Sequence, residues 1–178
     1  QPAPFFLKVL LFTLPQLGVA VLFAPISILA GLYAKYFGMS LADVASIILV
    51  AKLFDAVTDP LIGYWSDKLF ARTGSRKSLV LLGGLLLIPC SGFLYIPVFQ
   101  GNVFYFFCWY IFYYLAYTLF LIPSMAWANE FTEDTREKAM AFGTMNVMGL
   151  SGGVMFYSLP LLPFFISTEI TPEILKYT

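Results

Sequence analysis

Two aspartates four residues apart lie in a strongly apolar part of this chain. Asp55 and Asp59 belong to the run KLFDAVTDPLIGYWSDK, residues 52–68. In a helix this spacing places both carboxylates on one face, about 6 Å apart along the axis, with Lys52 and Thr58 close to that face. A charged side chain at the centre of a membrane span costs about 2.5–3.5 kcal/mol, so the pair must face protein or a wet cavity.

Two chemistries fit this carboxylate pair. Both carboxylates and the Thr58 hydroxyl suit a Na⁺ ion, and a coupled pair titrates in two steps, so that one group could exchange a proton near neutral pH. Alternatively, Lys52 or another basic residue neutralises the pair as a permanent internal salt bridge. Pro60 cannot donate to the carbonyl of Ala56, which either turns toward a cation or belongs to a simple kink.

The composition places this pair in a membrane protein. The chain of 178 residues is 60% hydrophobic and only 11% charged, whereas a soluble domain is about 25% charged. Apolar runs of about 20 residues recur, as membrane spans require. We expect an all-α membrane protein whose five spans cover about residues 5–34, 41–65, 78–98, 102–128 and 139–166. Pro15, Gly18 and Pro25 predict a bend in the first span.

The charges of the loops predict the orientation. Basic residues gather between the second and third spans and again between the fourth and fifth, whereas the other two loops are uncharged. The N-terminus and both basic loops are therefore expected in the cytoplasm. Residues 1–166 would form five of the six helices of an N-terminal transporter half, and residues 167–178 an outer-side tail that leads to a missing sixth span. The expected partners are the lipid bilayer, a small-molecule solute and the C-terminal half of the same transporter.

Other classes of protein find little support in the sequence. Ten basic residues balance ten acidic ones, and histidine is absent. The basic residues lie in loops and form no binding face, so we expect no nucleic-acid partner. Cys90 and Cys108 lie in separate apolar runs without metal-ligand spacing. We expect no enzyme, no cofactor and no metal site beyond Na⁺ at Asp55 and Asp59.

A few polar groups within the spans are candidates for contact with a solute. Tyr114 and Tyr117 belong to a tyrosine stripe in FYFFCWYIFYYLAYTLF, where they either stack on and hydrogen-bond to a sugar or contribute to aromatic packing. Gln16, in the bent first span, is a third candidate. Gly149 and Gly153 have the spacing of close helix packing.

The segment GYWSDKLFARTGSRKS is a candidate gating loop. Gly63 would permit close approach of a neighbouring helix, and Asp67 could cap or pair across the cytoplasmic end. Arg72, Gly74 and Arg76 complete the pattern, for which an ordinary positively charged cytoplasmic loop is the alternative. We also expect residues 130–138 to form salt bridges with this loop that help to close the inner side.

Taken together, these motifs resemble the glycoside-pentoside-hexuronide:cation symporter family of the major facilitator superfamily. The likeness runs through D-x-x-x-D-P-x-x-G-x-x-S-D-K and the step from Asp67 to Gly74, and YTLFLIPSMAWANEFTEDTREK resembles the family's fourth helix and following loop. The resemblance implies a major-facilitator-type helical bundle in a bacterial-type inner membrane. It also implies coupling to Na⁺ or H⁺.

The resemblance implies an intact cation side and an altered sugar side. It assigns the coupling cation to Asp55 and Asp59, with Thr58 and Thr118 contributing. The sugar-binding members carry acids at the positions of two apolar residues here, Val19 and Leu121, and the family's helix-five arginine is replaced near Met145 and Asn146.

The expected function is cation-coupled symport of a small solute, a sugar or glycoside. Two alternatives stay open. One is a non-transporting membrane sensor or scaffold with the same fold. The other is a symporter of a less polar solute such as a lysolipid.

Overall fold

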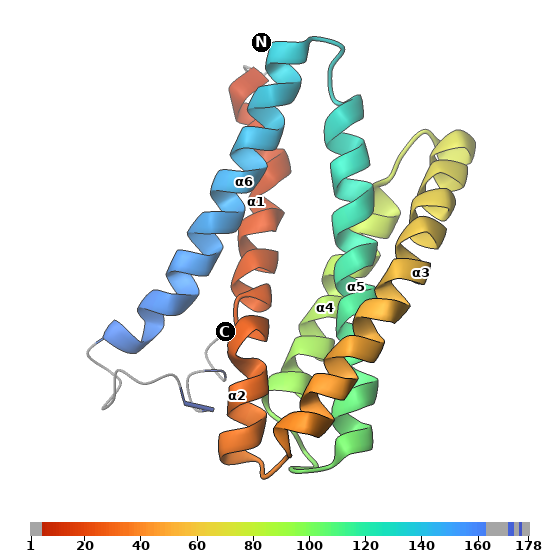
Figure 1. Cartoon of the computed structure of the whole chain (residues 1–178). Helices are drawn as coiled ribbons and strands as arrows, with labels where there is room; N and C mark the ends of the chain where they lie inside the picture. The colour runs from red at the N-terminus through yellow and green to blue at the C-terminus, as the bar shows by residue number, and fades with distance from the viewer. Residues whose placement is uncertain (1–4, 163–170, 173–174, 176–178) are drawn as a thin grey trace.

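The computed structural model describes residues 5–162, 171–172 and 175, and these residues form a bundle of long helices (Figure 1). The elements are α1 (Phe5–Phe23), α2 (Ile26–Tyr36), α3 (Leu41–Thr73), α4 (Lys77–Tyr95), α5 (Val103–Glu130), α6 (Thr135–Ser158) and the 3₁₀ turn η1 (Leu159–Leu161). The main packing pairs are α4 with α5, α1 with α6, and α3 with α5.

Four helical stretches within the described residues are long and apolar enough to cross a membrane. They are Phe5–Tyr36, Lys77–Tyr95, Val103–Glu130 and Thr135–Leu161. The predicted span 41–65 lies in α3, which is less apolar because charged side chains recur along it. Its 33 residues exceed the roughly 20 that a span needs. We propose that α3 also crosses the membrane, which brings the total to five spans.

The first predicted span bends where its prolines indicated. α1 ends at Phe23 and α2 begins at Ile26, with Pro25 between them, whereas Pro15 lies inside α1. Proline removes a backbone donor, which leaves helix carbonyls to be satisfied by other groups. Near this break the Leu22 carbonyl accepts hydrogen bonds from two tyrosine hydroxyls, those of Tyr95 and Tyr113.

Two helices end differently from their predicted bounds. α3 continues to Thr73 rather than about residue 65, and it ends where Gly74 adopts a left-handed conformation with φ of 67°. The helix continues through charged residues beyond the apolar region. Its backbone hydrogen bonds form within the helix, so they do not require a surrounding lipid. α6 begins at Thr135 rather than about residue 139, because the Asp134 carboxylate caps it.

At its far end, the fifth predicted span leaves the α-helical form before the predicted bound, whose last residues, 163–166, lie outside the described residues. The α-helix stops at Ser158 and gives way to the 3₁₀ turn, which contains Pro160. Proline cannot continue the i to i−4 ladder of an α-helix. The predicted tail, residues 167–178, lies outside the described residues except for residues 171–172 and 175.

Two glycines set the closest approaches between helices. A Cβ added at Gly152 on α6 would lie 2.6 Å from both the Leu17 carbonyl oxygen and the Ala20 Cβ of α1. A Cβ added at Gly83 on α4 would lie 2.7 Å from the carbonyl carbon of Leu119 on α5. Real Cβ atoms do not sit this close to a backbone, so these helix pairs depend on glycine.

The close packing predicted at three other glycines is wrong. A Cβ at Gly149 or Gly153 would meet no described atom within 4 Å, and one at Gly63 would lie 4.0 Å from the side chain of Ile122, an ordinary contact. Successive residues of a helix point about 100° apart. The face of α6 that meets α1 therefore carries Gly152, not its neighbour Gly153.

Candidate functional site

The carboxylate pair lies on α3, which packs against α5. The side chain of Asp55 is only 12% exposed. The Oδ1 atoms of both Asp55 and Asp59 are buried, and neither has a hydrogen-bond partner among the described residues. Buried acceptors without donors are costly and rare, so such a pair is suited to a proton or a small cation.

Lys52 contacts one member of the pair. Its Nζ lies 3.3 Å from Asp55 Oδ2 and 4.0 Å from the centre of the Tyr114 ring on α5. The salt bridge considered as an alternative therefore exists, but it occupies Asp55 Oδ2. Within the described part of the chain, the two Oδ1 atoms remain without a hydrogen-bond partner.

The other two predicted cation ligands are the hydroxyl groups of Thr58 on α3 and Thr118 on α5. The Thr58 hydroxyl donates to the Phe54 carbonyl at 3.1 Å, within its own helix. Thr118 is buried on α5, the helix that packs against α3. Pro60 lies inside α3, which continues through it. The roles of Thr58 and Thr118 stay predictions.

A cavity of about 380 Å³ brings the three predicted solute-contacting residues together. Gln16, Tyr114 and Tyr117 all line it, at a junction of α1, α2, α5 and α6. Gln16 Oε1 is a further buried acceptor without a hydrogen-bond partner in the described part of the chain. The lining residues are uncharged, so hydroxyl, amide and aromatic groups supply the chemistry of this cavity.

The tyrosine stripe divides between the cavity and the core. Tyr117 lines the cavity, where its ring stacks on Phe23 with centroids 4.1 Å apart. Tyr110 is buried, with its hydroxyl 3.4 Å from that of Tyr114. Aromatic packing therefore accounts for part of the stripe, and contact of Tyr114 and Tyr117 with a solute stays a prediction.

The sequence reasoning missed two polar residues of the cavity wall, Ser27 and Tyr157. Their side-chain oxygens lie 2.5 Å apart and join α2 to α6. A signal for Tyr157 exists in the sequence, because it follows Gly149 and Gly153 at a spacing of four residues and so shares their helix face.

The altered sugar-side positions lie away from this cavity. Val19 is buried in the hydrophobic core, and neither Val19 nor Leu121 is among the lining residues. Met145 instead lines a separate, largely apolar cavity of about 230 Å³, which Gln16 also reaches.

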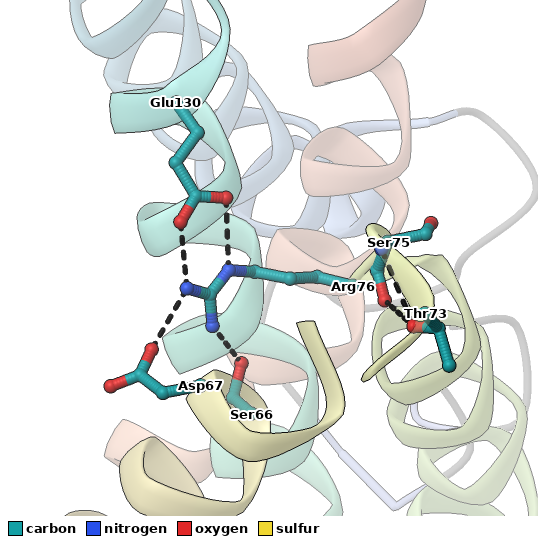
Figure 2. A network of polar contacts seen from close by, with 6 residues as sticks. All are labelled: Ser66, Asp67, Thr73, Ser75, Arg76 and Glu130. Atoms are coloured by element: carbon teal, nitrogen blue, oxygen red, sulfur yellow. Dashed lines mark hydrogen bonds and ion pairs between the residues drawn. The ribbon is translucent and has the colours of Figure 1, made fainter. Parts of the chain in front are cut away.

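The second polar centre is a cluster at the α3–α4 turn, built around Arg76 (Figure 2). The Arg76 side chain is 5% exposed, and its Nε and Nη2 donate to the two carboxylate oxygens of Glu130, at 3.1 and 2.7 Å. Its Nη2 also donates to Asp67 at 2.8 Å, and its Nη1 to Ser66 at 2.5 Å. The hydrogen bond to Glu130 raises the pKa of Arg76, so the guanidinium stays charged.

This cluster confirms the predicted salt bridge between residues 130–138 and the basic loop. It ties α3 and the start of α4 to the end of α5, with Gly74 making the turn that lets the chain reverse. Arg72 is not brought into the cluster, because it is exposed in the last turn of α3.

The described residues form an all-α bundle with apolar helices of membrane length, as in an integral membrane protein. A family model described as MFS/sugar transport protein matches residues 7–177. The chain belongs to this family, among the glycoside-pentoside-hexuronide:cation symporters. No solved structure matches the chain.

Three bacterial relatives illustrate this membership. YagG of Escherichia coli (strain K12), named as a candidate glycoside/cation symporter, is 34% identical over 65% of the chain. The uncharacterized symporter YnaJ of Bacillus subtilis (strain 168) is 29% identical over 76% of it, and the inner membrane symporter YicJ of Escherichia coli (strain K12) is 29% identical over 69%. The chain spans 26%, 30% and 27% of the length of these three relatives.

Proposed function

We propose that this chain supplies five spans of the N-terminal half of a cation-coupled symporter, in which Asp55 and Asp59 hold the coupling ion, Na⁺ or H⁺. The observation that carries this proposal is the pair of buried Oδ1 atoms on α3 that have no hydrogen-bond partner among the residues that the structure describes. A carboxylate pair kept only for structure would have its acceptors satisfied, as the Arg76 cluster does.

The solute proposed for the cavity is an uncharged sugar or glycoside. The wall offers the hydroxyls of Ser27, Tyr114, Tyr117 and Tyr157 together with the Gln16 amide. Neutral hydroxyl-rich solutes match such groups, whereas an anionic solute would lack a countercharge there. A less polar solute such as a lysolipid is the alternative that uptake measurements must exclude.

In this mechanism the ion and the solute each favour the same conformational state, which is what couples their movements. A C-terminal half completes the pathway, and rocking of the two halves provides alternating access. The Arg76 cluster holds the cytoplasmic ends of α3, α4 and α5 together while the inner side is closed. The N-terminus faces the cytoplasm, and the membrane is a bacterial inner membrane.

Calorimetric titration of the full-length protein with NaCl, accompanied by measurement of proton release, tests the ion site. We expect saturable ion binding in the wild type and its loss in Asp55→Asn and in Asp59→Asn. Asp43→Asn is the matched control, because Asp43 is an exposed carboxylate at the start of the same helix. Binding that persists undiminished in both site variants would reject the proposal.

The solute assignment is tested on the same protein in proteoliposomes. We expect an imposed Na⁺ or H⁺ gradient to drive uptake of neutral glycosides from a labelled panel and to drive no uptake of lysophosphatidylcholine. Tyr157→Phe should lower the affinity for the transported glycoside, because it removes one hydroxyl from the wall. Uptake of the lysolipid alone would overturn the sugar assignment.

A further inference from the structure

Lys52 touches both the ion site and the wall of the solute cavity. Its ammonium lies 3.3 Å from Asp55 Oδ2 and 4.0 Å from the centre of the Tyr114 ring. Tyr114 in turn lines the cavity that also contains Gln16 and Tyr117. A single flexible cation therefore bridges two sites that lie on different helices.

A cation bound at the ion site would compete with the Lys52 ammonium for the carboxylate of Asp55. Asp55 and Asp59 are two acids and Lys52 is one base, so binding of one monovalent cation brings the group to formal neutrality. A free cation at the two Oδ1 atoms would share Asp55 with the ammonium of Lys52. Like charges this close repel strongly when they are shielded from water.

The side chain of Lys52 is free to respond to this repulsion. It is 55% exposed, compared with 12% for Asp55, and the lysine stem is long and flexible. The Tyr114 ring already holds the ammonium by a cation–π contact. It is therefore the partner that remains when the contact with Asp55 weakens.

Building on the function proposed above, we infer that Lys52 is a positioning residue that links the ion site to the solute cavity. A cation bound at Asp55 and Asp59 displaces the Lys52 ammonium from Asp55 toward the Tyr114 ring, and the ring carries that change into the cavity wall. The hydroxyl of Tyr114 lies 3.4 Å from that of Tyr110, and its ring lies 6.2 Å from that of Phe23. Movement of Tyr114 therefore alters the surroundings of a bound solute. By reciprocity, a solute that contacts Tyr114 changes the affinity for the cation by the same factor.

Fluorine NMR of the full-length protein labelled with 3-fluorotyrosine tests this link with the cation alone. The Tyr114 resonance is assigned by its loss in Tyr114→Phe. We expect NaCl, or acidification in sodium-free buffer if the proton is the ion, to shift this resonance with the same midpoint as the calorimetric binding. The shift should be lost in Lys52→Met and retained in Lys52→Arg.

Lys68→Met is the matched control, because Lys68 lies on the same helix with its ammonium 5.7 Å from the ring of Tyr64. It should leave the Tyr114 shift intact. Lys52→Gln carries the same expectation as Lys52→Met and replaces it if that variant does not fold.

Three outcomes would overturn the link. The first is ion binding in the wild type without any movement of the Tyr114 resonance. The second is a shift that persists in Lys52→Met. The third is complete loss of ion binding in Lys52→Met, which would make Lys52 part of the ion site itself. Absence of any ion binding in the wild type would instead defeat the proposed function, so the two failures are distinguishable.

Discussion

At the scale of single residues, two groups of charged side chains, each with members on α3, are satisfied to different degrees. The guanidinium of Arg76 has partners for all three of its nitrogens, on Ser66, Asp67 and Glu130 (Figure 2). Asp55 and Asp59 each keep a buried oxygen that has no hydrogen-bond partner in residues 5–162, 171–172 and 175. Saturated hydrogen bonding is typical of a structural cluster, and unsatisfied acceptors are typical of a site that acts on something else.

The Arg76 cluster leads to a prediction about stability. Arg76→Lys should lower the free energy of unfolding by about 1.5–3 kcal/mol, because an ammonium cannot reproduce the fork that holds both oxygens of Glu130. Thermal unfolding of the full-length protein in detergent measures this loss. Glu130→Gln should also destabilise, whereas the exposed control Glu133→Gln should not. Equal melting temperatures for the two glutamate variants would contradict the role given to the cluster.

At the scale of elements, the helices meet through single glycines rather than through glycine pairs. α6 approaches α1 at Gly152, and α4 approaches α5 at Gly83. The sequence marks Gly149 and Gly153 by their spacing of four residues, but it does not show which glycine of α6 faces α1. That choice depends on how α6 is rotated about its axis.

Gly152→Ala and Gly153→Ala should therefore have opposite effects on stability. The first inserts a Cβ 2.6 Å from the backbone of Leu17, and overpacking of this kind costs about 1–3 kcal/mol. The second meets nothing within 4 Å among the described residues, so it should gain the helix propensity of alanine, about 1 kcal/mol at most. Thermal unfolding of the two variants, measured side by side, tests whether their stabilities change in opposite directions. Equal destabilisation would show that α6 is rotated differently.

At the scale of the whole molecule, two successive turns of the described chain differ in charge, as expected for turns on opposite sides of a membrane. The turn between α3 and α4 carries Arg76, whereas the turn between α4 and α5 is uncharged. The cytoplasmic N-terminus proposed above makes these two turns lie on opposite sides of the membrane.

Cysteine labelling tests this orientation. In a full-length background freed of native cysteines, Gln100→Cys should react with a membrane-impermeant maleimide in intact cells, because residue 100 is exposed in the turn that we propose lies outside. Arg72→Cys should react only after the membrane is permeabilised. The reverse pattern would invert the proposed topology.

The sequence by itself determined the features that depend on composition and on neighbours within one helix. Apolar runs identify the membrane helices, Pro25 marks the break between α1 and α2, and the spacing of Asp55 and Asp59 places them on one face. These features could be predicted because hydropathy and helical periodicity are local properties.

Only the tertiary structure decided which helix faces meet. It pairs Arg76 with Glu130 across 54 residues, and it brings the Lys52 ammonium onto the Tyr114 ring. It also places Tyr157 in the cavity wall and Gly152, rather than Gly153, against α1. These contacts depend on the rotation and tilt of each packed helix, and helices that are apolar over most of their surface leave both undetermined by their hydrophobic pattern.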